Sequence, residues 1–132
     1  MNILIIEPDK VLSNIYINAF KHLGFNVFVA KSAQSALTLA DENPPNLVIL
    51  EIQLVEHSGI EFLYEFRSYS EWKDIPIIIY SCIPAHEFNN NWEILKKEIG
   101  IEEYLYKPKT NLKQLIKIVK EVTSKQSEAI KY

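Results

Sequence analysis

Four short, continuous runs of apolar residues constrain the fold of this chain more than any other feature of its sequence. They are residues 3–6, 27–30, 47–50 and 77–80, and residues 104–106 form a weaker fifth run. A strand that is buried on one face only alternates apolar with polar residues, and these runs do not alternate. They therefore predict strands that are buried on both faces of a parallel sheet.

Helical patterns separate the apolar runs. Apolar residues recur at three- and four-residue steps within five segments, which are 12–23, 32–40, 58–66, 88–99 and 110–122. Ser32, Ser58 and Thr110 are expected to cap three of these helices, and Gly24 and Gly100 to end two of them. Strand and helix thus alternate five times. Because parallel strands need crossover connections, this order predicts an α/β fold, a five-stranded parallel sheet with helices on both faces.

The composition is that of one globular domain. The chain has 132 residues, of which 48% are hydrophobic and 23% charged. We place the domain at residues 1–123 and a helix end or tail at 124–132. The net charge of −3 argues against general affinity for nucleic acid or membranes. With a single cysteine, no basic leader and no long apolar run, we expect a cytoplasmic location.

Polar residues follow the predicted strands at the points where they end. In a parallel sheet these carboxyl ends meet at one edge, where ligands bind. The residues placed there are Glu7, Pro8, Asp9, Glu51, Gln53, Ser81, Cys82, Lys107 and Pro108. Clustered carboxylates suit magnesium, while a hydroxyl and an ammonium suit a phosphoryl group. The set describes a pocket of the phosphoryl-transfer kind.

Four segments, in order, carry a resemblance to a known family. They are residues 3–9 (ILIIEPD), 47–51 (LVILE), 77–81 (IIIYS) and 104–108 (YLYKP). Over residues 1 to about 123 the chain resembles the receiver domain of bacterial two-component response regulators. That resemblance implies the (βα)₅ flavodoxin-like fold and a role in phosphorelay signalling rather than enzymatic catalysis.

The resemblance also implies roles for individual residues. The phosphoacceptor position is Glu51, and Ser81 and Lys107 are the positions that contact the phosphoryl group. Lys107-Pro108 matches a bond that is often cis in the family, and Tyr104 matches an aromatic residue that changes rotamer on activation. Glu7 matches the first position of the acid pair that helps to hold magnesium.

Two departures from the family pattern bear on function. The family phosphorylates an aspartate, whereas Glu51 places its carboxylate more than about 1 Å further out, and such misplacement can cost around 100-fold in rate. The second acid of the pair is replaced by Pro8, which has no carboxylate. The sequence therefore predicts a degenerate pseudo-receiver that works without phosphorylation. Glu51 then either mimics the phosphorylated state or freezes the switch.

The cofactor prediction is no cofactor, or weakly bound magnesium held by Glu7, Glu51 and Gln53. Asp9 is a further candidate ligand, although we favour it as the N-cap of the first helix. The competing function is a working receiver with magnesium-dependent phosphorylation at Glu51 or a nearby acid. A flavodoxin-like nucleotide or flavin binder is a third alternative, against which no glycine-rich phosphate loop is present.

The C-terminal quarter of the chain is basic, with seven lysines and two glutamates from Tyr104 onward. Trp92, Lys113 and Lys117 are predicted to belong to a protein-binding face of the fourth helix, fifth strand and fifth helix. A basic face of this kind prefers an acidic partner surface. A stand-alone domain would act through a histidine kinase, a downstream effector or a second copy of itself.

Overall fold

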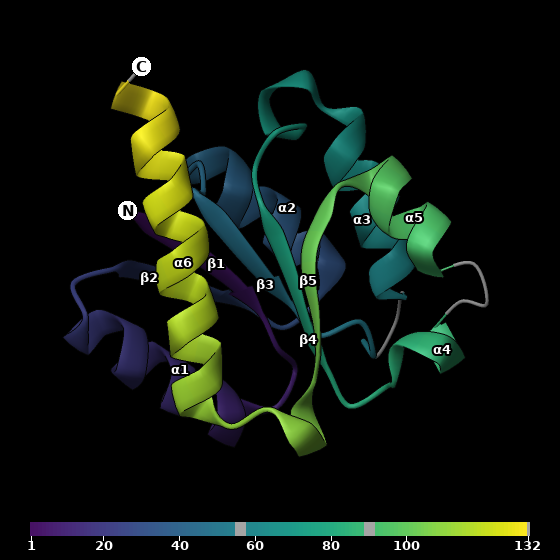
Figure 1. Cartoon of the computed structure of the whole chain (residues 1–132), viewed down its shortest axis with the longest axis horizontal. Helices are drawn as coiled ribbons and strands as arrows, with labels where there is room; N and C mark the ends of the chain where they lie inside the picture. The colour runs from purple at the N-terminus through teal and green to yellow at the C-terminus, as the bar shows by residue number, and fades with distance from the viewer. Residues whose placement is uncertain (55–57, 89–91, 132) are drawn as a thin grey trace.

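The computed structural model describes residues 1–54, 58–88 and 92–131. Its sheet consists of β1 (Asn2–Ile6), β2 (Asn26–Ala30), β3 (Leu47–Leu50), β4 (Ile77–Ser81) and β5 (Ile101–Tyr106). The strands are all parallel and lie in the order β2-β1-β3-β4-β5 (Figure 1). The four apolar runs predicted strands 1 to 4 to within one residue at either end. The fifth strand begins three residues earlier than predicted.

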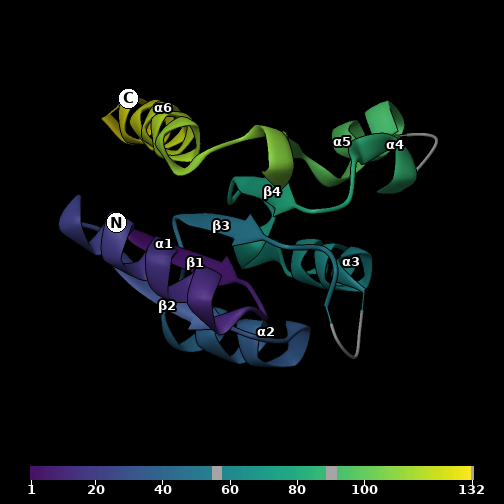
Figure 2. The same cartoon turned by 90° about the horizontal axis from the view of Figure 1, so that it is seen from below.

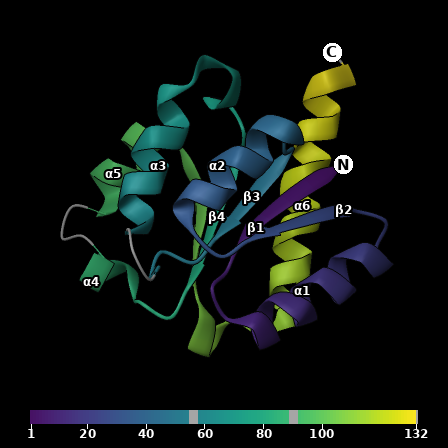
Figure 3. The ribbon, with the colours of Figure 1, turned by 180° about the vertical axis from the view of Figure 1, so that it is seen from behind.

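Helices connect the strands and cover both faces. They are α1 (Lys10–His22), α2 (Ala33–Glu42), α3 (Gly59–Ser68), α4 (Ala85–Phe88), α5 (Trp92–Ile99) and α6 (Leu112–Lys131), with single 3₁₀ turns η1 (Ser70–Trp72) and η2 (Lys107–Lys109). Figures 2 and 3 show α1 and α6 on one face and α2, α3 and α5 on the other. The predicted α/β fold with helices on both faces is therefore confirmed.

Each strand divides its side chains between two cores. Leu4 and Ile6 of β1 pack with Phe62 and Phe66 of α3. The side chains of β1 that alternate with them, such as that of Ile3, pack with α1 and α6. Successive side chains of a strand point to opposite faces, so a continuous apolar run fills both cores at once. This is why the runs do not alternate.

Polar side chains and glycines define most helix ends as predicted. Asp9 accepts a hydrogen bond from the Leu12 amide at 3.0 Å, and Ser32 and Ser58 cap α2 and α3 in the same way. Gly24 and Gly100 adopt positive φ values of 93° and 77° after α1 and α5. These are conformations that residues with a Cβ rarely adopt.

One helix cap differs from the prediction. Asn111, not Thr110, caps α6, because the Asn111 side chain accepts from the Gln114 amide at 2.9 Å and the Gln114 side chain accepts from the Asn111 amide at 2.8 Å. The helix predicted over 88–99 includes α5, and residues 89–91 within it lie outside the described part. Helix α6 continues to Lys131, so the segment 124–131 extends this helix.

Arg67 of α3 links this helix by hydrogen bonds to η1 and to the end of α5. Its guanidinium donates to the carbonyls of Ile99 at 2.6 Å, Trp72 at 2.7 Å and Gly100 at 2.9 Å. Two of these carbonyls lie at the end of α5, where a helix leaves acceptors without partners. The sequence analysis missed this residue, since a single arginine in a helical pattern reads as a solvent-exposed position.

The start of α3 leaves no room for a side chain. The Gly59 amide donates to the Ile52 carbonyl at 2.9 Å, and a Cβ on Gly59 would lie 2.5 Å from the Ile52 Cα. A contact this short with backbone forces the chain to move. Ile52 directly follows Glu51, so this close approach also fixes the backbone beside the strand-end acids.

We expect Gly59→Ala to lower the free energy of unfolding by about 1–3 kcal/mol, because overpacking a filled site costs that much. Chemical denaturation monitored by circular dichroism measures the change. Glu65→Ala, at an exposed position of the same helix, is the matched control and should stay within about 0.5 kcal/mol of the native protein. Equal stability of the native protein and Gly59→Ala would contradict the prediction.

Candidate functional site

The site lies at the carboxyl end of the sheet, where β1 and β3 are neighbours. Glu7 follows β1 and Glu51 follows β3, and both are buried, with 3% and 5% of their surface exposed. The Glu7 amide donates to the Ala30 carbonyl at 3.0 Å, and the Glu51 amide donates to the Ile6 carbonyl at 2.9 Å. The parallel ladder thus continues one residue past the strands and carries both acids inward.

Lys107 brings its ammonium between these two acids from the end of β5. Its Nζ donates to Glu51 Oε1 at 2.9 Å and to Glu7 Oε1, and only 10% of the Lys107 side chain is exposed. The same Nζ lies 5.7 Å from the centre of the Tyr80 ring, within cation–π range. One cation is therefore shared by two buried carboxylates.

The Glu51 carboxylate accepts hydrogen bonds from four donors. Ser81 Oγ and the Gln53 amide (3.1 Å) donate to Oε2, while Lys107 Nζ and the Cys82 amide (3.2 Å) donate to Oε1. An ionised carboxylate has about four acceptor positions. Those of Glu51 are all occupied by protein groups.

These contacts hold Glu51 and Lys107 in their charged forms. Burial alone would raise the pKa of the Glu51 carboxyl, but the hydrogen bonds from Ser81 and Lys107 outweigh it and lower that pKa below 4.5. Burial alone would lower the pKa of Lys107, and the hydrogen bonds to Glu7 and Glu51 instead raise it above 10.5. The pair is ionised at every physiological pH.

The remaining pocket residues have supporting positions. Asp9 is exposed and caps α1, and its amide donates to Glu7 Oε2 at 3.2 Å. The side chain of Gln53 is exposed, and its contact with Glu51 is made by the backbone. Pro108 lies in η2, and because none of the described peptide bonds is cis, the Lys107–Pro108 bond does not have the isomer expected from the family.

The donor set does not fit a magnesium ion in this arrangement. Magnesium takes one or two carboxylates with free oxygens and completes its octahedral shell largely with water. The acceptor positions of Glu51 are filled, Oε1 of Glu7 faces Lys107, and Pro8 contributes no carboxylate. Across the described residues, no three His, Cys, Asp or Glu side chains lie together as metal ligands. The ammonium of Lys107 already neutralises the two acids.

Tyr104 is half-buried beside the site. Its hydroxyl donates to the Ile83 carbonyl at 2.5 Å, and its ring meets Trp92 of α5 edge-on, with centroids 4.8 Å apart. Burial raises the pKa of Tyr104 to about 12, so the hydroxyl keeps its proton. The Ile83 amide donates in turn to Ser81 Oγ at 3.1 Å. Hydrogen bonds therefore run from Glu51 through Ser81 and Ile83 to Tyr104.

The elements of the predicted protein-binding face, the fourth helix, fifth strand and fifth helix, correspond to α5, β5 and α6, and this face stays a prediction. Trp92 of α5 is partly buried and packs with Tyr104 against the core on that face of the sheet. Lys113 and Lys117 are exposed on α6, which covers the opposite face of the sheet. Strand β5 separates α5 from α6 in Figure 1.

Sequence reasoning missed two donors to Glu51, because the amides of Gln53 and Cys82 belong to the backbone and carry no signature in residue type. The Cys82 side chain itself is exposed. Within the described residues, no helix is both long and apolar enough to cross a membrane.

Comparison with known proteins identifies the family. Residues 3–120 match the response regulator receiver domain. The chain is 30% identical to the KDP operon transcriptional regulatory protein KdpE of Escherichia coli (strain K12) over 107 residues, which are 81% of this chain and 44% of that protein. The chain thus spans less than half the length of this relative.

Solved structures agree with this assignment. A two-component response regulator from Clostridium difficile is 26% identical with a TM-score of 0.80, covering 96% of this chain and 98% of the other. The chemotaxis protein CheY4 of Vibrio cholerae shares the fold at 21% identity, with a TM-score of 0.80 over 92% and 97% of the two chains. With the family match across most of its length, this chain belongs to the receiver domains of two-component response regulators.

Proposed function

We propose that this receiver domain signals through protein–protein contacts in a state that phosphorylation does not set. One observation carries the proposal: four protein donors occupy the acceptor positions of Glu51. The carboxylate at the phosphoacceptor position is engaged as a permanent structural anion. A histidine kinase or a downstream effector would then recognise a surface whose conformation does not depend on phosphorylation.

Glu51 is poorly placed to act as a nucleophile. Attack on a phosphoryl group requires a free lone pair aligned with the leaving oxygen, and in phosphoryl transfer nearly all catalysis is positioning and charge neutralisation. Freeing either oxygen would break two hydrogen bonds, to Ser81 and Gln53 or to Lys107 and Cys82. Pro8 further removes an acid with which the site would hold magnesium.

The contacts of Glu51 also support a mimic of the phosphorylated state. Ser81 and Lys107 are the positions that contact a phosphoryl group in the family, and both donate to Glu51. The longer side chain brings negative charge to donors that a phosphoryl oxygen would otherwise engage. The hydrogen-bonded path through Ile83 would couple the position of Tyr104 to this fixed charge.

We expect the native protein to gain no phosphoryl group when it is incubated with magnesium and a small-molecule phosphodonor. Intact-mass spectrometry before and after incubation measures this directly. Glu51→Asp and Glu51→Asp/Pro8→Asp are tested in parallel, because they restore the shorter acceptor and then the missing acid. Modification of the native protein would overturn the proposal, whereas modification of a variant alone would show that Glu51, or Glu51 with Pro8, locks the site.

Removing the shared cation should be costly. We expect Lys107→Met to lower the free energy of unfolding at neutral pH by about 3–5 kcal/mol, because Glu7 and Glu51 are then buried without a neutralising cation. Lys109→Met removes an exposed lysine two residues away and should change stability by less than about 0.5 kcal/mol. Equal effects of the two substitutions would contradict a role for Lys107 as internal cation.

The same variants should differ in their pH dependence. In the native protein the pKa of Glu51 is below 4.5, so its contribution is complete above that pH and is lost as pH falls through the folded value. In Lys107→Met the two buried acids lose the cation that stabilises their charged forms, so the loss of stability is largest at the pH values where they are ionised. Denaturation from pH 4 to pH 8 should therefore show a deficit that grows with pH, whereas a constant deficit would exclude unpaired acids as its cause.

A further inference from the structure

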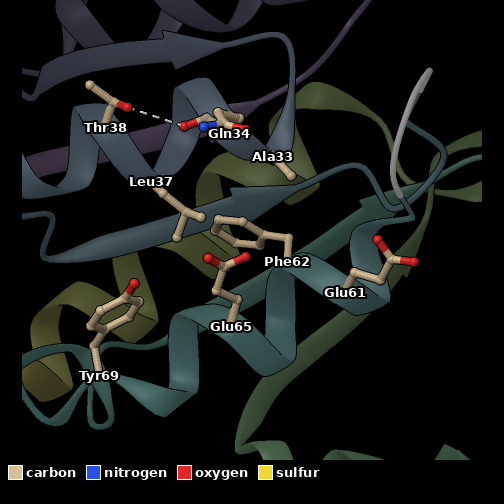
Figure 4. Close-up of a pocket in the computed structure, with 8 residues that line it drawn as sticks. All are labelled: Ala33, Gln34, Leu37, Thr38, Glu61, Phe62, Glu65 and Tyr69. Carbon is tan, nitrogen blue, oxygen red and sulfur yellow. Dashed lines mark hydrogen bonds between the residues drawn. The ribbon is translucent and has the colours of Figure 1, made fainter.

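A groove between α2 and α3 combines an apolar floor with an acidic wall. The hollow measures about 440 Å³, and Leu37 of α2 and the fully buried Phe62 of α3 meet at its floor (Figure 4). Glu61 and Glu65 lie one helical turn apart on α3, and Tyr69 follows at its end. Glu65 and Tyr69 are exposed. The groove therefore suits a group that is apolar along its length and positively charged at its tip.

The opposite face of the molecule carries side chains of this kind. Lys113, Lys117 and Lys120 are exposed on α6 and surround the half-buried Ile116 beside a shallow hollow of about 450 Å³. A lysine lays its four-carbon stem along apolar surface and keeps its ammonium outside. These three residues define the lysine face of α6. Its apolar stems and positive charges complement the apolar floor and the glutamates of the groove.

The two surfaces also match in spacing. Glu61 and Glu65 are four residues apart on α3, as are Lys113 and Lys117 on α6, so each pair is separated by about 6 Å along its helix. We propose that copies of this domain associate head to tail, with the lysine face of α6 of one copy against the α2–α3 groove of the next. The lysine stems would cover Leu37, and the ammonium groups would meet the two glutamates.

The position of the two surfaces determines the kind of assembly. The groove belongs to the face of the sheet that α2, α3 and α5 cover, and α6 lies on the other face (Figure 2). Contact between two different surfaces is heterologous, so each added copy leaves a groove at one end and a lysine face at the other. The assembly is therefore an open chain or a closed ring and not a symmetric pair.

The association should be weak and sensitive to salt. Exposed ion pairs contribute little each, and salt screens them over roughly 10 Å at 0.1 M and 3 Å at 1 M. In sedimentation velocity at low salt, we expect the mean sedimentation coefficient to rise with protein concentration. The rise should disappear at 1 M NaCl. A monomer at every concentration, or association that salt does not weaken, would overturn the proposal.

Charge reversal identifies the surfaces. Glu61→Lys/Glu65→Lys makes both surfaces basic, and Lys113→Glu/Lys117→Glu makes both acidic, so neither variant should associate with itself. An equimolar mixture of the two should associate at least as strongly as the native protein, because every contact then joins opposite charges. Self-association of either variant, or a mixture that remains monomeric, would show that another surface is used.

A matched control separates this effect from net charge. Asp41→Lys/Glu42→Lys changes charge by the same amount at exposed positions of α2 that do not line the groove, and it should associate like the native protein. Loss of association in this control would overturn the assignment. Thermal unfolding checks that each variant is folded, and Glu65→Lys alone, outside the first turn of α3, provides the same test should the double variant not fold.

Discussion

The Lys107 ammonium between Glu7 and Glu51 is the interaction on which the carboxyl end of the sheet depends. Two buried carboxylates on neighbouring strands repel each other, and each lies too deep for water to neutralise. A lysine at the end of edge strand β5 reaches back past β4 to both of them. One side chain thereby joins the ends of β1, β3 and β5 and fixes the charges around which Ser81 and the loop amides are arranged.

This arrangement differs in kind from a site that works through exchangeable groups. A bound cation or a phosphoryl group can leave, and its departure changes the state of the protein. The cation here is covalently part of the chain, and the anion at the acceptor position is a side chain that accepts from four neighbours. Under the proposed function, the charges that would distinguish two signalling states are combined in one state of the receiver fold.

The sequence predicted those features that depend on the types of the residues involved. Continuous apolar runs identified the strands, because a strand buried on both faces has no polar alternation, and strand-end polar residues identified Glu7, Glu51, Ser81 and Lys107. Prediction from the sequence failed where backbone groups make the contact or where two side chains compete for the same position. The amides of Gln53 and Cys82 have no sequence signature, and Asn111 displaced Thr110 as a cap because Gln114 completes a reciprocal pair with it. The role of Arg67 depends on carbonyls that only the folded chain brings within reach.

The long separation between Lys107 and its partners has a consequence for how the chain folds. Lys107 lies 56 residues after Glu51 and 100 residues after Glu7, so a chain emerging from the ribosome contains both acids well before their cation. A partly built sheet of β1 to β4 would hold two unpaired negative charges at one end. These unpaired charges destabilise such a fragment. The destabilisation ends when the last strand brings Lys107 to the two acids. The buried acids therefore favour folding of the domain as a single unit over accumulation of an incomplete sheet with an exposed edge.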